Sequence, residues 1–222
     1  MAAGDCTVEY VEFETRRGER AAEAIVAAAL RCLARDGYAA TSIQDIAHEA
    51  GTSKRMVHYY FETREQLFAV VAQRVGDQLL DNVREAVSGL DDPEEIISVG
   101  VDRWWEHVTG NADAEIVYFG LLAESFTDPV LKEALASVND GLRSMLRWRI
   151  RESTGRKHAE RGDEETAIVL TVALIQGLKL HYLERGDSPQ LQDALNVFKQ
   201  WLVRVLEGTA RLSVEPRSSA HS

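Results

Sequence analysis

Apolar residues recur at the spacing of an α-helix along most of the chain, and this periodicity is the strongest constraint on its fold. In "RAAEAIVAAALRCLARDG" five apolar residues share one helix face: Ile25, Ala28, Ala29, Cys32 and Leu33. The stretch with strand-like character, "VEYVEF", has no second strand to pair with. The sequence therefore predicts an all-α fold of about nine helices.

Side chains that can accept a hydrogen bond from free backbone N–H groups mark where the helices begin. They stand at Ser42, Ser53, Thr63, Asp92, Asn111, Asp128 and Ser188, and proline follows three of the last four. Asp45 lies three residues after Ser42, close to the pattern of a capping box. Gly37 is expected to end the first helix, and the polar segment 154–165 is expected to be a loop.

These boundaries divide the chain into parts of different character. Residues 1–16 are expected to be a flexible arm, and 17–62 a helix-turn-helix domain. Residues 63–212 are predicted to form a helical ligand-binding and dimerisation domain, whose first helix, 63–88, connects it to the N-terminal domain. Residues 213–222 are expected to be a polar tail.

The charge of the chain narrows the kind of partner it can have. The net charge of −11 argues against non-specific polyanion binding, because phosphate attraction dominates such binding. Between residues 41 and 64, however, three cations offset three acids, so the rest of the chain carries the whole negative charge. Positive charge is therefore available locally, where a site-specific DNA contact would need it.

The same composition predicts a cytoplasmic protein without membrane or metal partners. The N-terminus has acids where a signal peptide needs cations. No apolar run approaches the roughly 20 residues that span a bilayer. Cys6 and Cys32 have neither metal-ligand spacing nor the pattern of a disulfide framework, and Cys32 is expected to be buried.

The segment "GTSKRMVHYYFETREQL" (51–67) reads as a short amphipathic helix followed by the start of a longer one. Val57, Tyr60 and Phe61 fall on one side, whereas the other side carries cations and hydrogen-bonding rings. Two short helices joined by a glycine-containing turn are the arrangement that places the second helix in a DNA major groove. The alternative is that the polar side is simply a solvated face.

The polar residues of this region suit contacts with DNA. Arg55 can form a bidentate hydrogen bond to guanine, and Lys54 can reach a base or a phosphate. Ser42 and Ser53 stand at helix N-termini, where backbone N–H groups favour an anion. The remaining candidates for phosphate contacts are His58, Tyr59 and Arg64.

The segment "TSIQDIAHEAGTSKRMVHYYFETREQL" resembles the DNA-binding motif of the TetR family of transcriptional regulators, and "AIVAAALRCLARDGYAA" resembles its first helix. The resemblance covers about 50 residues, including Gly37 and Gly51. It implies backbone contacts from Ser42, Ser53, His58, Tyr59 and Arg64, and base contacts from Gln44, Lys54 and Arg55. Members of the family often have glycine at the position of Arg55 and tyrosine at that of His58.

Two later helices carry more apolar surface than one buried face requires. The segment 167–183 is apolar on nearly every side until Lys179, and the last helix has a widened apolar stripe. This surplus predicts that the two helices form a four-helix bundle with their mates in a homodimer, unless they pack in an ordinary internal core. The predicted interface comprises Ile168, Val172, Ala173, Ile175, Gly177, Leu195, Phe198, Trp201, Leu202 and Val205.

Large rings and a few polar groups gather on three neighbouring helices that precede these two. They fit an apolar effector cavity as well as an ordinary core. The candidate residues for binding a small hydrophobic or aromatic effector are Trp104, Trp105, His107, Tyr118, Phe119, Leu122, Glu124, Phe126, Met145, Trp148 and Gln176.

The motifs of common enzymes do not occur. "HEAGT" begins like a zinc-protease helix but has Thr52 where the second histidine is required, and phosphate-binding and nucleophile-elbow motifs are missing. We therefore expect no catalytic residue, cofactor or metal. The sequence predicts a homodimeric repressor that binds a palindromic double-stranded DNA operator and is released by an effector. The alternatives are an architectural or activator protein without an effector, and a helical-bundle enzyme.

Overall fold

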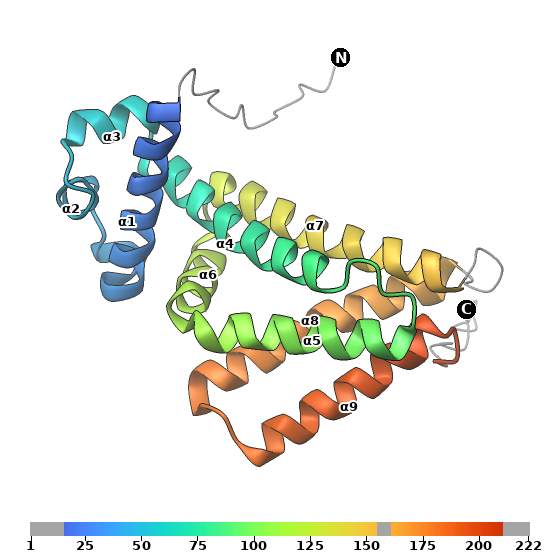
Figure 1. Cartoon of the computed structure of the whole chain (residues 1–222). Coiled ribbons are helices and arrows are strands. Elements are labelled where there is room, and N and C mark those ends of the chain that lie inside the picture. The colour runs from blue at the N-terminus through green and yellow to red at the C-terminus, as the bar shows by residue number, and fades with distance from the viewer. Residues whose placement is uncertain (1–15, 155–160, 211–222) are drawn as a thin grey trace, which may run out of the picture. The chain divides into compact units, whose positions relative to one another are not determined.

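The computed structural model describes residues 16–154 and 161–210, and within these ranges every regular element is a helix (Figure 1). The all-α prediction is therefore confirmed. The helices are α1 (Arg16–Ala40), α2 (Ile43–Glu49), α3 (Lys54–Tyr60), α4 (Arg64–Ala86), α5 (Pro93–Gly110), α6 (Ala112–Glu124), α7 (Pro129–Thr154), α8 (Arg161–Arg185) and α9 (Pro189–Leu206). The expectations for the arm up to residue 15 and for the tail fall outside the described residues.

Six of the seven predicted helix starts have the expected side-chain cap, whereas the Asn111 side chain instead donates to the His107 carbonyl oxygen of α5 at 2.9 Å. Ser42 Oγ accepts a hydrogen bond from the Asp45 N–H at 3.2 Å, and the Asp45 carboxylate accepts one from the Ser42 N–H at 3.1 Å, which completes the capping box. Ser53 caps α3 in the same way, with Met56 N–H as the donor. Caps at Asp92 and Ser188 open α5 and α9, each followed by proline.

The loop expected over 154–165 does not extend to its predicted end, because α8 already begins at Arg161, and residues 155–160 lie outside the described part of the chain. Ion pairs to α7 support this early start. Glu164 is buried and lies 3.0 Å from Arg151 Nε, while Glu165 lies 2.7 Å from Arg147 Nη2. Acidic side chains near a helix N-terminus also interact favourably with the helix dipole. The polar composition that indicated a loop therefore partly reflects an inter-helix ion-pair cluster.

The chain packs into two compact units. Unit 1 contains the residues up to Gln73 together with Val117–Ala134, and unit 2 contains Arg74–Ile116 and the residues from Leu135 onward. All three boundaries between the units fall inside helices, so α4, α6 and α7 each belong partly to one unit and partly to the other. The segment predicted to be the helix-turn-helix lies in unit 1.

Unit 1 buries the apolar face of α1 against α2, α3 and the start of α4. Ile25, Ile46, Val57 and Phe68 are at most 2% exposed. Burying a side chain of this size contributes about 1.5–3 kcal/mol, so these four residues supply much of the force that fixes the short helices. Gly37 has a φ of 75°, which ends the regular part of α1 where the sequence places the cap.

Unit 2 has two apolar clusters among its described residues. One joins α5 to α9 and contains Val101, Trp104, Val108, Leu195, Phe198 and Leu202. The other contains Val87, Ile96, Ile150, Ala167, Ile168, Val205 and Leu206. The ring centroids of Trp104 and Phe198 lie 6.3 Å apart in an edge-to-face contact, an arrangement that aromatic pairs favour. These contacts hold α9 within its own subunit.

Helix α8 combines strong apolar character with little burial. Its segment Glu164–Arg185 is long and apolar enough to cross a membrane by length and composition, which the sequence reading did not expect, yet only 22% of that window is buried. Its exposed apolar side chains are Val169, Leu170, Leu174 and Leu180. Such a surface is typical of an interface with another molecule.

Candidate functional site

Helix α3 has one buried side and one exposed side, as its sequence predicts. Val57 is fully buried and Tyr60 is 8% exposed, whereas Tyr59 is 75% exposed. Lys54, Arg55 and His58 are exposed beside Tyr59. The packing of Val57 and Tyr60 therefore fixes the rotation of the helix so that its cations and its second tyrosine face solvent.

Helix α2 sets the position of α3 through the turn between them. Ile46 and Ala47 of α2 are buried, and the Thr52 N–H donates to the Ala47 carbonyl oxygen at 2.8 Å. Gly51 has a φ of 64°, a conformation that side-chain-bearing residues rarely adopt. Ser42 and Gln44 are exposed at the start of α2, and Ser53 is exposed at the start of α3.

The two acids of α2, Asp45 and Glu49, are engaged within unit 1. Arg31 Nε donates to Glu49 at 2.8 Å, and this hydrogen bond lowers the pKa of the Glu49 carboxyl. The hydrogen bonds from Ser42 lower the pKa of Asp45. Lys54 and Arg55, in contrast, form no ion pair with any described residue. The exposed face of α3 thus presents cations whose charge is not offset by a direct partner, which favours the approach of a polyanion.

Arg64 makes contacts within unit 1 that the sequence did not predict. Its guanidinium lies over the Tyr38 ring at 4.5 Å from the centroid and donates to the carbonyl oxygens of Tyr38 and Thr41 at 3.4 and 3.3 Å. It also pairs with Glu65 at 3.2 Å. The helix dipole disfavours a cation in the first turn of α4. These contacts within the protein account for Arg64 at this position, so no phosphate is needed to explain it. Its predicted phosphate contact stays a prediction, but the side chain is already engaged.

The predicted effector residues are divided between the two units. Tyr118 and Phe119 lie in unit 1, where their ring centroids are 5.6 Å apart, together with the half-buried Leu122 and Glu124. Phe126, however, is 82% exposed, because it follows the end of α6 in the turn before α7. Its predicted place in a closed apolar cavity is therefore not observed within unit 1.

In unit 2 the predicted tryptophans form an aromatic cluster. The ring centroids of Trp104 and Trp105 lie 5.4 Å apart, and Trp105 makes an edge-to-face contact with Tyr182 at 5.4 Å. Trp104 Nε1 is buried without a hydrogen-bond partner among the residues described. Tyr182 was missed because it lies at the polar end of the apolar segment of α8. Met145 and Gln176 are half-buried.

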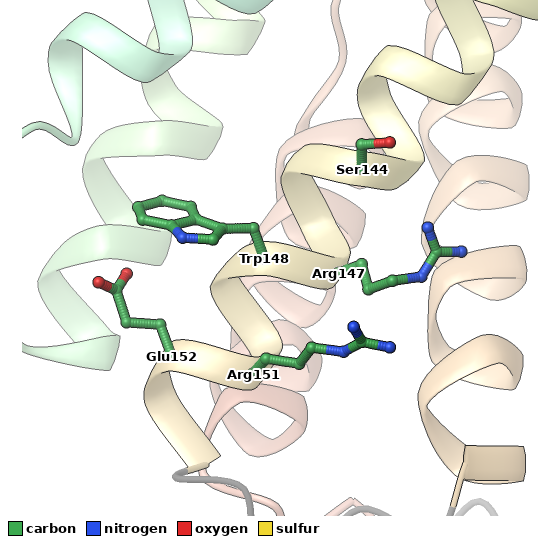
Figure 2. Close-up of a pocket in the computed structure, with 5 residues that line it drawn as sticks. All are labelled: Ser144, Arg147, Trp148, Arg151 and Glu152. Carbon is green, nitrogen blue, oxygen red and sulfur yellow. The ribbon is translucent and has the colours of Figure 1, made fainter.

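Trp148 lines an open groove on α7 and is 55% exposed (Figure 2). Its predicted contact with an effector stays a prediction. The groove has a volume of about 540 Å³ and is lined by Ser144, Arg147, Trp148, Arg151 and Glu152. Arg147 and Arg151 extend to one side of the helix, where they pair with Glu165 and Glu164. The indole lies under the guanidinium carbon of Arg149 at 4.6 Å, which explains why this large ring is stable at the surface.

Unit 2 contains a buried ion pair that the sequence did not predict. Lys179 Nζ of α8 is 2.5 Å from a carboxylate oxygen of Glu115 in α6, and the two side chains are 5% and 1% exposed. His107 of α5 is close enough to both for electrostatic interaction, and burial lowers its pKa. The His107 ring is hydrogen-bonded to Asn82 of α4 at 3.1 Å. An acid in the first turn of a helix looks like an ordinary dipole partner, which is why Glu115 gave no separate signal.

The predicted dimer residues fall into two groups. Ile168, Leu195, Phe198, Leu202 and Val205 are buried inside the cores of unit 2, and Ile175 and Trp201 pack against those cores. Their side chains are therefore occupied within the subunit and do not form an external face. Ala173 and Gly177 are exposed and Val172 is half-buried. A Cβ at Gly177 would meet no atom of its own subunit within 4 Å.

Two protein families have models that match parts of this chain. Residues 25–71 match the N-terminal model described as bacterial regulatory proteins of the tetR family. Residues 109–207 match the model described as the C-terminal part of BetI-type transcriptional repressors. The first match covers α2, α3 and most of α1, which are the elements that carry the exposed cations.

Individual relatives agree with these matches. The chain is 24% identical to the HTH-type transcriptional regulator BetI of Brucella canis over 186 residues, covering 83% of this chain and 90% of that protein. It is 29% identical over 87 residues to the nicotine-responsive transcriptional repressor HdnoR of Paenarthrobacter nicotinovorans, covering 39% and 45% of the two chains.

Solved structures share the fold. A transcriptional regulator from Saccharomonospora viridis, solved in complex with choline, aligns with a TM-score of 0.69 at 22% sequence identity, covering 83% of this chain and 96% of that one. Regulators of this kind bind DNA and are not enzymes. The chain therefore belongs to the TetR family of bacterial transcriptional regulators, with a DNA-binding helix-turn-helix in its N-terminal part.

Proposed function

We propose that this protein is a cytoplasmic, ligand-responsive repressor that binds a palindromic DNA operator as a homodimer. The observation that carries the proposal is the exposed face of α3, where Lys54, Arg55, His58 and Tyr59 face solvent while Val57 and Tyr60 are buried. Arg55 supplies a bidentate contact to guanine, Lys54 contacts a base or phosphate, and the two rings donate to phosphate oxygens. Gln44, Ser42 and Ser53 add contacts from the ends of the short helices.

The homodimer forms through α8. Its exposed residues Val169, Leu170, Leu174 and Leu180 make an apolar face, and the exposed Ala173 and Gly177 let a second helix approach closely. Helix α9 contributes the exposed Val197 rather than its buried stripe. A twofold axis through this face makes the operator a near-palindrome, with half-sites about 34–36 Å apart, one turn of DNA.

The effector is small and largely hydrophobic. Rings in unit 2 support this class, because Trp104, Trp105 and Tyr182 provide apolar and hydrogen-bonding surface together. The structural neighbour in complex with choline and the nicotine-responsive relative suggest small organic amines as the first compounds to screen. Aromatic faces attract such cations.

Effector and DNA compete by a population shift. The effector binds better to a state in which the two α3 helices are wrongly spaced, and the operator binds better to the other state. Because this coupling is a free energy shared by both ligands, DNA must weaken effector binding by the same factor by which the effector weakens DNA binding.

The proposal is tested with DNA selected from a random duplex library by the full-length protein. We expect a near-palindromic sequence and a footprint with twofold symmetry. A thermal-shift screen of small amines and hydrophobic compounds then identifies ligands. A bound ligand raises the melting temperature, and the increase grows with the ratio of the ligand concentration to its Kd. An identified ligand should lower the affinity for the selected duplex. A selected sequence without symmetry would contradict binding as a symmetric dimer. If the identified ligands do not change the affinity for DNA, the protein is a DNA-binding regulator that does not respond to an effector.

A further inference from the structure

Three helices carry the chain from one unit into the other. The boundary lies between Gln73 and Arg74 in α4, between Ile116 and Val117 in α6, and between Ala134 and Leu135 in α7. Any influence of unit 2 on the DNA-reading unit that passes through the backbone must travel along these helices. How unit 2 holds each of them therefore bears directly on regulation.

Helices α4 and α7 are held to each other by close apolar packing directly after they enter unit 2. A Cβ at Gly76 would lie 2.4 Å from Val138 Cγ1, and one at Gly141 would lie 3.1 Å from Leu80 Cδ1. Such contacts are short-range, and they do not depend on charge.

Helix α6 is held in a different way. Glu115, two residues before the boundary, forms the buried ion pair with Lys179 of α8. Its position in the first turn of α6 also favours a negative charge, because the helix N-terminus is positive. Lys179 lies far from either end of α8, so no helix terminus stabilises its charge, and burial lowers its pKa. The hold on α6 therefore depends on the charge of both groups.

Stability alone does not explain this pair. Apolar side chains of similar volume usually replace a buried ion pair without loss of stability, whereas removal of one partner leaves an uncompensated buried charge. The pair also lies beside His107, which is bonded to Asn82 of α4. One charged centre thus connects residues of α4, α5, α6 and α8.

We propose that the Glu115–Lys179 ion pair is a charge-dependent latch that positions α6, and that unit 2 controls DNA affinity through it. The latch rests on the proposed function, because its output is the affinity of the dimer for its operator. Neutralising either group frees the first turn of α6 from α8, so the part of α6 in unit 1 is no longer fixed from unit 2. The two reading helices then lose their common spacing, and DNA affinity falls.

The test compares full-length variants by fluorescence anisotropy with the duplex selected by the wild-type protein. Lys179→Met and Glu115→Gln should each raise Kd by about tenfold or more, the usual size of such couplings. The conservative Lys179→Arg keeps the charge and should stay near the wild-type Kd. The matched control is Asp102→Asn, which removes the ion pair between Asp102 and Lys199, an exposed pair of unit 2, and it should leave Kd unchanged.

Hydrogen exchange separates a latch from a merely structural pair. Exchange is measured in Lys179→Met and in the wild type, well below the melting temperature of the variant. The amides of residues 117–124 should exchange about tenfold faster in the variant than in the wild type, while those of α1 keep their wild-type protection. If a single variant does not fold, the double variant Glu115→Leu/Lys179→Met removes both charges without leaving one of them buried and unpaired. It should fold, but its Kd should rise and residues 117–124 should exchange faster, whereas wild-type values of both would overturn the latch.

The outcomes distinguish the latch from the proposed function. If Arg55→Ala weakens binding but Lys179→Met leaves both Kd and the exchange of α6 unchanged, the latch is overturned and the repressor is not. A lowered melting temperature with unchanged Kd would likewise reduce the pair to a structural role. If the wild-type protein selects no duplex, the proposed function fails, whereas unchanged exchange in α6 would still overturn the latch independently.

Discussion

The guanidinium of Arg64 lies over the Tyr38 ring, 4.5 Å from its centroid, and donates to the Tyr38 carbonyl oxygen. This contact ties the first turn of α4 to the segment that ends α1. The guanidinium carbon also lies over the Phe68 ring, 5.4 Å from its centroid. Arg64 therefore holds the reading unit together from inside, so its removal would affect α1 and α4 at once.

Replacing Arg64 by alanine should lower the free energy of unfolding by about 1–3 kcal/mol, since it removes a cation–π contact and hydrogen bonds to two carbonyl oxygens. Urea denaturation followed by circular dichroism measures the change. Arg20, an exposed arginine of α1, is the matched control, and Arg20→Ala should stay within about 0.5 kcal/mol of wild type. Equal effects of the two variants would show that the contact contributes little.

Introducing an aspartate at Leu174 should convert the dimer into monomers. This side chain is 43% exposed in the apolar face of α8, so a charge there would be buried without a partner in the dimer. Sedimentation equilibrium gives the molar mass. Ala136→Asp places the same charge on an exposed site of α7 and should leave the mass unchanged. A dimer that survives Leu174→Asp would place the interface elsewhere.

Adding one methyl group at Gly76 should destabilise the protein by about 1–3 kcal/mol, because its Cβ would lie 2.4 Å from the branched side chain of Val138. Gly120 offers the matched control within α6, since a Cβ there meets nothing within 4 Å. Gly120→Ala should stabilise by about 0.5–1 kcal/mol through its helix propensity. Thermal unfolding of both variants should show shifts of opposite sign.

Acidification should weaken the fold through His107. Burial holds its pKa below the ordinary value of 6.5, so the unfolded chain takes up a proton at a higher pH than the folded one. Stability contributed by the neutral ring is therefore complete above pH 6.5 and is lost as the pH falls toward the folded pKa. Unfolding free energies of wild type and His107→Gln, compared from pH 7.5 to 5, isolate this contribution from that of the carboxylates. Parallel curves for the two proteins would contradict it.

Local patterns in the sequence predict the helices and the polarity of α3 well, because caps and helical spacing are properties of neighbouring residues. Ser42 caps α2 and Val57 is buried for reasons visible within a few positions. Periodicity shows that Phe198, on the apolar stripe of α9, must be buried but not against which molecule, and in the structure it packs within its own subunit. Packing within the subunit decides that question.

Long-range partners explain the other differences. Arg64 and Tyr38 are 26 residues apart, and Glu115 and Lys179 are 64 apart, so neither pair leaves a local signature. The two residues of a buried ion pair each look like ordinary surface charges in the sequence. Trp148 is a different case, because it looks like a core residue in the sequence and only the structure shows that it lies on an open groove.

The affinity of the full-length dimer for its selected duplex, before and after Arg55→Ala and Tyr59→Ala, tests the central claim most directly. We expect each variant to weaken binding by about 1–3 kcal/mol while the dimer and its melting temperature stay unchanged. Arg204→Ala, which removes an exposed cation of α9, should bind DNA like the wild type. If Arg55→Ala and Tyr59→Ala bind as tightly as Arg204→Ala, α3 does not read DNA and the account is contradicted.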